Sequence, residues 1–332
     1  MQPYEELITF ARETLALSLT AKIEILPFPT RGSNRKYFRL KWDDHSLILM
    51  HYDPSRRENT RFAEIASFLK EIDIPVAEII RSDSHRCLIL MQDLGDTDLW
   101  SLRDKPWEVR KVYYLRTLEV ACKLHAFPPQ QFPSGRIQLM EPFGPSLYQW
   151  EHNYCKDQFI SRLCGIELDS ASLEKLNFEL SYLVGKLSLQ PKSLVHRDLQ
   201  SQNVLLYHEK IFLIDFQGMR FGSPFYDLAS LLCDPYVNFT EPEREEMLMF
   251  YYALAGKSIG WRFFQQAFWE ASVQRLMQAL GAYAFLGLTH GLKGYRDYIP
   301  AGLKNLQIAV ERAGSFPQLR KLCSRCEKVL AA

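Results

Sequence analysis

The stretch from residue 194 to residue 217 constrains the fold more than any other part of this 332-residue chain. It reads Leu-Val-His-Arg-Asp-Leu-Gln-Ser-Gln-Asn-Val-Leu-Leu and then, after a short polar segment, Ile-Phe-Leu-Ile-Asp-Phe-Gln. Short apolar runs separated by polar residues predict strands joined by turns. We therefore expect Asp198, Asn203 and Asp215 to lie in the turns, where their side chains are not needed for the core.

These three residues are of the types that phosphoryl transfer requires. The reaction needs a carboxylate beside the acceptor hydroxyl and oxygen ligands that hold Mg²⁺ against the phosphates of ATP. Asp198 is predicted to be the catalytic base and to contact the substrate, and Asn203 and Asp215 are predicted to bind the metal. The alternative is that all three are ordinary turn and strand-end residues. Their fixed spacing in a strand context favours the catalytic interpretation.

The order of motifs resembles the aminoglycoside phosphotransferase and choline kinase superfamily, over about residues 28 to 305. Its pattern is His-x-Asp-x₄-Asn, then Ile-Asp-Phe, then Gly222-Ser-Pro-Phe-Tyr-Asp227-Leu-Ala. Protein kinases place a long activation segment after the metal-binding Asp, whereas Asp227 follows Asp215 after only 227 − 215 = 12 residues. The resemblance implies a bilobal protein-kinase-like α+β fold, bound ATP and Mg²⁺, and a catalytic loop supported by His196 and Asp227.

Further motifs are similar to the branch of kinases that act on the anomeric hydroxyl of cell-wall amino sugars. They are Tyr37-Phe-Arg39, Asp93-Leu-Gly95 and the run from Tyr226 to Tyr236. This similarity implies phosphorylation of N-acetylmuramate or N-acetylglucosamine in peptidoglycan recycling. Two alternatives stay open: a kinase for an aminoglycoside, choline or another amino alcohol, and a nucleotide-binding regulatory pseudokinase.

The pattern along the chain predicts two lobes. Residues 1–94 form the predicted nucleotide-binding lobe, with strands expected at residues 36–42, 46–50, 76–80 and 87–91. One helix interrupts these strands and begins with the capping-box spacing of Ser55 and Glu58. Residues 95–332 form a predicted helical lobe for catalysis and acceptor binding. Its long helical segments include 107–125 and one that is capped by Thr240-Glu-Pro-Glu243 and ends near residue 256.

The first lobe carries the predicted nucleotide contacts, which lie in or just after the turn at residues 30–34, in the strand at residues 46–50 and in the interlobe hinge. These residues are Gly32, Ser33, Asn34, Lys36, Met50, Gln92, Asp93 and Leu94. The strand at residues 46–50 lacks the Lys that protein kinases use at the phosphates. Arg35, Lys36 or Arg39 could supply that charge instead, Mg²⁺ could neutralise more of it, or nucleotide affinity could be low.

Two acidic residues near aromatic side chains are predicted to bind the acceptor. Glu151 lies in Trp-Glu-His-Asn-Tyr and Asp234 in Asp-Pro-Tyr, and sugar recognition combines aromatic faces with carboxylates and amides. The alternatives are that Glu151 lies on an exposed helix surface and that Asp234 caps a helix.

Composition indicates which kinds of binding partner and which cellular compartment suit this chain. A net charge of +1 with scattered basic residues argues against a nucleic-acid surface. No stretch approaches the roughly 20 apolar residues that span a bilayer, and seven cysteines without framework spacing suit a reducing compartment. We expect a cytoplasmic monomer that binds a small molecule and neither nucleic acid nor membrane.

Overall fold

The structure is a computed structural model that describes residues 4–29, 35–256 and 259–331. Its contacts divide the chain into two compact units. The first, here called the sheet unit, consists of Met1–Thr97, Pro133–Met140 and Leu205–Gln217. The second, the helical unit, consists of Asp98–Phe132, Glu141–Val204 and Gly218–Ala332. The predicted α+β fold class is confirmed, while the lobe assignment 1–94 and 95–332 stays a prediction.

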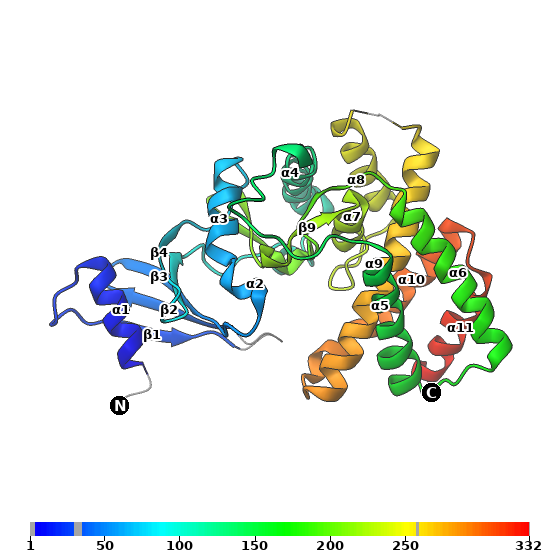
Figure 1. Ribbon diagram of the computed structural model, residues 1–332, viewed down its shortest axis with the longest axis horizontal. Coiled ribbons are helices and arrows are strands. Elements are labelled where there is room, and N and C mark those ends of the chain that lie inside the picture. The colour runs from blue at the N-terminus through cyan, green and yellow to red at the C-terminus, as the bar shows by residue number, and fades with distance from the viewer. Residues whose placement is uncertain (1–3, 30–34, 257–258, 332) are drawn as a thin grey trace. The chain divides into compact units, whose positions relative to one another are not determined.

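The sheet unit is built on five antiparallel strands in the order β1-β2-β3-β5-β4. Strands β1 to β4 are labelled in Figure 1. Their bounds are β1 Glu24–Pro27, β2 Lys36–Trp42, β3 His45–His51, β4 Ile79–Asp83 and β5 Leu88–Gln92. Strand β2 has the predicted bounds, whereas the strand expected at residues 76–80 begins three residues later. Val76 instead pairs with Leu213, which leaves Pro75 and Val76 outside the five-stranded sheet.

Three helices accompany this sheet: α1 Glu5–Leu15, α2 Arg57–Thr60 and α3 Phe62–Glu71. Helix α1 covers one face, where Leu7 packs in a buried cluster with Phe38 and Leu40 of β2 and with Leu88 and Leu90 of β5. Alternate residues of a strand point to one face, which explains why positions two apart share this cluster. The predicted cap at Ser55 is wrong, because α2 begins at Arg57 without a side-chain cap bond.

A hairpin of β7 Val204–Tyr207 and β8 Lys210–Leu213 follows the catalytic loop, and most of it belongs to the sheet unit. His208 and Glu209 form its turn with φ angles of 47° and 58°, the left-handed pair that suits a two-residue hairpin. Leu206 N donates to Thr97 O at 2.7 Å, and Leu213 N donates to Pro75 O at 2.8 Å. These bonds fix the segment that ends in Asp215 to the sheet unit.

The helical unit contains eight long helices among its described residues, together with the short pair β6 Ser193–Val195 and β9 Arg220–Gly222. The helices are α4 Trp107–His125, α5 Pro145–Cys155, α6 Ser170–Ser188, α7 Pro224–Leu232, α8 Glu241–Leu254, α9 Trp261–Thr289, α10 Ile299–Ala313 and α11 Pro317–Ala331. The predicted capping box of Thr240 and Glu243 is present at the start of α8. Within the described part of the chain, every helix is too short or too polar to span a lipid bilayer.

Helix α9 is the centre of this unit and contacts α5, α7 and α10. Its residues 270–281 are all buried, so that no side of this stretch faces solvent. A Cβ at Gly281 would lie 3.1 Å from the backbone nitrogen of Cys155, which shows how closely α5 approaches α9. Buried polar groups need hydrogen-bond partners. Gln274 and Arg275 find them on α5, on α7 and in the loop that carries Asp198, whereas Glu270 and Gln278 bond to other residues of α9.

Candidate active site

The predicted catalytic loop starts after β6 and is held in place by α7. Asp227 is fully buried, and its carboxylate accepts hydrogen bonds from His196 N at 2.7 Å and Arg197 N at 2.8 Å. His125 Nε2, on α4, lies 3.0 Å from the same carboxylate, and its Nδ1 lies 2.7 Å from Tyr251 Oη. His196 Nδ1 accepts from Asp198 N at 3.3 Å, which closes the turn that carries Asp198. These contacts fix the backbone of the loop from three elements.

Removing the Asp227 carboxylate is expected to destabilise the protein by about 3 kcal/mol, because its backbone donors and His125 lose their buried partner. The measurement is urea denaturation of Asp227→Ala followed by far-UV circular dichroism. Asp297→Ala, which removes an exposed carboxylate from the same unit, is the control and should unfold like the unmodified protein. Equal stability of the two variants would contradict the supporting role of Asp227.

Asn203 ends the same loop, in a 3₁₀ turn at Ser201–Asn203. Its Nδ2 donates to Asp198 O at 2.9 Å. Because the amide nitrogen is used in this bond, the amide oxygen is the atom that could bind a cation, and oxygen ligands suit Mg²⁺. The structure thus brings Asp198 and Asn203 together in one loop.

Asp234, which was predicted to bind the acceptor, supports this loop instead of facing solvent. It is fully buried and accepts from Ser201 N at 2.8 Å, Ser201 Oγ at 2.6 Å and Tyr236 N at 2.9 Å. Burial raises the pKa of Asp234 to about 6, while the hydrogen bonds from Ser201 and Tyr236 act to lower it. Its role in acceptor binding stays a prediction.

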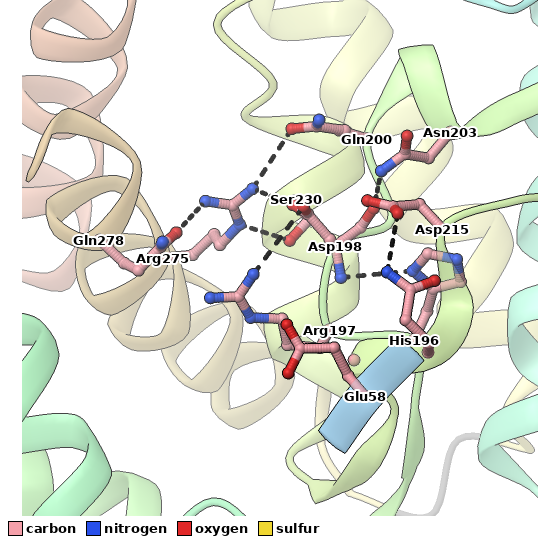
Figure 2. A network of polar contacts seen from close by, with 12 residues as sticks. Glu58, His196, Arg197, Asp198, Gln200, Asn203, Asp215, Ser230, Arg275 and Gln278 are labelled. Carbon is pink, nitrogen blue, oxygen red and sulfur yellow. Dashed lines mark hydrogen bonds and ion pairs between the residues drawn. The ribbon is translucent and has the colours of Figure 1, made fainter. Parts of the chain in front are cut away.

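The Asp198 carboxylate is paired with an arginine from α9. Arg275 Nη2 donates to Asp198 Oδ1 at 2.7 Å (Figure 2), and the Arg275 side chain is only 7% exposed. Its other nitrogens are held by Ser230 Oγ at 2.7 Å and Gln278 Oε1 at 2.5 Å. The guanidinium is therefore fixed from two helices, and Asp198 in turn is fixed by the guanidinium.

Glu151 lies in the same unit, on α5, and is also buried. Its Oε1 accepts from Tyr226 Oη at 2.9 Å, and its Oε2 accepts from Gln274 Nε2 at 2.9 Å. Burial raises the pKa of Glu151, although Arg197 and Gln274 act against this shift. The predicted alternative of an exposed helix position is wrong, because Glu151 is 1% exposed. Its contact with the acceptor stays a prediction.

Asp215 belongs to the sheet unit, where it follows β8 in a left-handed conformation with φ of 62°. Its Oδ1 accepts from Arg35 Nη2 at 2.5 Å and from Gln217 Nε2 at 2.8 Å. The Arg35 side chain is 9% exposed, and Tyr37 and Glu58 are among its electrostatic neighbours. Arg35, one of the three candidate cations, thus contacts the predicted metal ligand.

Arg39, another of the three candidates, is paired with other carboxylates of the sheet unit. Its guanidinium donates to Asp93 at 2.7 and 3.0 Å and to Asp96 at 2.7 and 2.8 Å. Asp93 also accepts from Ser46 Oγ and from Gly95 N. Burial works against ionisation of Asp93, but the hydrogen bonds from Arg39 and Ser46 lower its pKa. This network rigidifies the end of β5.

The remaining predicted nucleotide residues are placed as follows. Met50, in β3, and Leu94, after β5, are buried, and Gln92 is half-buried at the end of β5. Lys36 is exposed at the start of β2. Gly32, Ser33 and Asn34 lie outside the described residues. Nucleotide binding by this whole set stays a prediction.

From the sequence, Arg35 is one of three candidate cations for the phosphates, and Arg275 is a candidate to close the acceptor pocket. Neither is predicted to contact Asp198 or Asp215. Arg275 lies inside a long helical pattern, and a single charged residue there carries no spacing signal. Arg275 contacts a carboxylate that lies 77 positions away in the sequence, and no short sequence pattern can predict such a contact. Arg35 and Asp215 are separated by 180 positions.

Comparison with known proteins gives a consistent result for most of the chain. Residues 24–267 match the family model described as the phosphotransferase enzyme family. A protein named N-acetylmuramate/N-acetylglucosamine kinase, from Pseudomonas aeruginosa, is 25% identical over 310 residues, which cover 90% of this chain and 87% of that protein.

Solved structures of kinases share the fold. The choline kinase of Cryptosporidium parvum has a TM-score of 0.66 at 14% identity, covering 96% of this chain and 99% of its own. The ADP-bound aminoglycoside phosphotransferase APH(2'')-Ib has a TM-score of 0.60 at 14% identity, covering 93% and 99%. At these identities the likeness establishes the fold alone.

Proposed function

We propose that this chain, which belongs to the phosphotransferase enzyme family, transfers the γ-phosphoryl group of ATP to the anomeric hydroxyl of a cell-wall amino sugar. The predicted superfamily is confirmed, and the protein is an ATP-dependent small-molecule kinase. N-acetylmuramate and N-acetylglucosamine are the proposed acceptors, because the curated relative carries both names and is similar over 90% of this chain. We further propose a cytoplasmic monomer that acts in peptidoglycan recycling.

The observation that carries this proposal is the anchored loop that presents Asp198. Its backbone is fixed by Asp227, and its carboxylate is fixed by Arg275. A positioned carboxylate can orient a hydroxyl and accept its proton during in-line transfer, which is most of what a protein contributes to this reaction. The anomeric hydroxyl is more acidic than an ordinary alcohol, so a carboxylate already paired with a cation is a sufficient base.

The proposed metal ligands are Asn203 and Asp215. Both offer oxygen atoms, the ligand type that Mg²⁺ prefers. When bound, Mg²⁺ would neutralise phosphate charge and polarise the γ-phosphoryl group. The protein would provide Asn203 from the catalytic loop and Asp215 from the end of the β7–β8 hairpin.

The charges around Asp198 favour a neutral or acidic acceptor over an aminoglycoside or choline. Arg275 contacts the Asp198 carboxylate, and the two nearby acids, Glu151 and Asp234, are both buried and hydrogen-bonded within the protein. A cationic acceptor would need uncompensated carboxylates, since like charges repel. The arginine therefore disfavours the cationic substrates.

The test is an ADP-release assay with Mg²⁺ and four acceptors: N-acetylmuramate, N-acetylglucosamine, an aminoglycoside and choline. Turnover with the amino sugars, and a sugar 1-phosphate identified by ³¹P nuclear magnetic resonance, would support the proposal. Turnover only with the aminoglycoside or choline would show that the acceptor is not an amino sugar of the cell wall. No turnover with any acceptor would favour a pseudokinase.

We also propose that Arg35 takes the place of the absent strand lysine at the phosphates. Arg35→Met is expected to raise KM for ATP by about 10- to 100-fold, because one charge-assisted contact is lost. Steady-state kinetics at varied ATP concentration measure this effect. Lys36→Met tests the neighbouring candidate, and Lys41→Met, on the same strand and exposed, is the control. A larger effect in Lys36→Met than in Arg35→Met would reject Arg35.

A further inference from the structure

Arg197 is the other cation beside Asp198, and its guanidinium has no hydrogen-bond acceptor among the described residues. Its Nε is buried without a partner, and its Nη1 lies 3.9 Å from Asp198 Oδ2, which is beyond hydrogen-bond range. The side chain is 27% exposed. Arg275, which contacts the same carboxylate, is in contrast held by Ser230, Gln278 and Asp198.

The backbone at Arg197 is also unusual. Its φ is 80°, a region that favours glycine and that a residue with a Cβ rarely adopts. The Asp227 carboxylate holds this conformation through the hydrogen bond from Arg197 N. Strained backbone that the surroundings enforce is found most often at functional sites. The chain thus places an arginine at a position where glycine would fit with less strain.

The acidic groups around Arg197 offset its charge only in part. Its electrostatic neighbours are Tyr226, Asp198, Glu151 and Arg275, all in the helical unit. Glu151 already accepts from Tyr226 and Gln274, and its burial disfavours the charged form. Asp198 is shared with Arg275. A half-buried guanidinium with unused donors is suited to a ligand anion, because its planar fork matches the two oxygens of a carboxylate.

We propose that Arg197 binds a carboxylate carried by the acceptor, so that the enzyme prefers an acidic sugar to its neutral counterpart. This inference rests on the proposed function, whose two acceptors form a suitable pair. N-acetylmuramate is N-acetylglucosamine with an added lactyl ether, and its carboxylate is their only difference in charge. Arg197 is then a specificity-determining residue, separate from the base Asp198 and its partner Arg275.

The test is calorimetric binding of each sugar to the full chain without nucleotide, in the unmodified protein and in Arg197→Gly. We expect the unmodified protein to bind N-acetylmuramate at least about 10-fold more tightly, the gain typical of a charge-assisted pair. In Arg197→Gly this preference should disappear, mainly through weaker binding of N-acetylmuramate. Arg197→Lys, which keeps the charge without the fork, should retain part of it.

Glycine suits the backbone at this position, so Arg197→Gly should melt at the same temperature as the unmodified protein or higher; if it does not fold, Arg197→Gln replaces it. Equal binding of the two sugars by the unmodified protein, or an equal loss for both in the variant, would overturn the inference. Weaker ATP binding with an unchanged sugar preference would assign Arg197 to the phosphates and also overturn it. A binding preference without turnover on either sugar would refute the proposed reaction while supporting the role of Arg197.

Discussion

Replacing Asp198 by alanine is expected to lower kcat by between about 10²- and 10⁴-fold, the range for loss of a positioned general base. ATP affinity should change little, because Asp198 is proposed to contact the acceptor hydroxyl and not the nucleotide. The carboxylate is also the partner of Arg275 at 2.7 Å, so its removal leaves a buried positive charge near the acceptor. The measurement is kcat with N-acetylmuramate, together with the dissociation constant of ATP from calorimetry.

A second variant at the same position makes this experiment specific. Asp198→Asn keeps the shape and a hydrogen-bond acceptor for Arg275 but cannot take a proton, so it should lose nearly as much turnover as Asp198→Ala. If the carboxylate only anchored Arg275, the asparagine would retain most of the activity. Wild-type turnover in either variant would refute Asp198 as the base.

Replacing Asp215 by alanine is expected to remove turnover and to weaken ATP binding in the presence of Mg²⁺. The physical reason is that a carboxylate ligand contributes both to holding the metal and to orienting the phosphates. In this respect Asp215→Ala should differ from Asp198→Ala, which leaves nucleotide binding nearly unchanged. Calorimetric titration of ATP with and without Mg²⁺ separates the two variants.

The control for Asp215→Ala is Asp96→Ala. Asp96 is an exposed carboxylate of the same unit that pairs with Arg39, so its removal also breaks an arginine–carboxylate contact but touches no predicted metal ligand. It should leave Mg²⁺-dependent ATP binding within about 2-fold, because surface pairs contribute little. If Asp215→Ala bound ATP as tightly with Mg²⁺ as the unmodified protein does, Asp215 would not be a metal ligand.

Local features of the fold could be predicted because neighbours in the sequence create them. Strand β2 and the helix Trp107–His125 have the expected bounds. The cap expected at Thr240 and Glu243 is also present. Each depends on residues a few positions apart, whose spacing can be compared with a helical or strand period. Ser55 shows the limit of this approach, since it has the right spacing for a cap but the helix begins two residues after it.

The same reasoning applies to the proposed catalytic residues. Asp198 and Asn203 were predicted from a spacing of five, and they share one loop in which Asn203 bonds to the Asp198 carbonyl. The motif also implied support from Asp227, whose contacts with the backbone of the loop the structure describes. The charge around Asp198 could not be predicted, because Glu151 and Asp234 look available in the sequence and are buried in the structure.

The sequence alone thus determined the superfamily, the class of chemistry and the loop that presents Asp198, because these depend on short spacings along the chain. Tertiary structure decided which charges meet. Arg275 reaches Asp198 because α9 is buried against α5 and α7, and Arg35 reaches Asp215 because β7–β8 joins the sheet unit. A hydrophobic pattern shows which face of a helix is buried but not which polar group will oppose it. That choice depends on the packing of elements far apart in sequence.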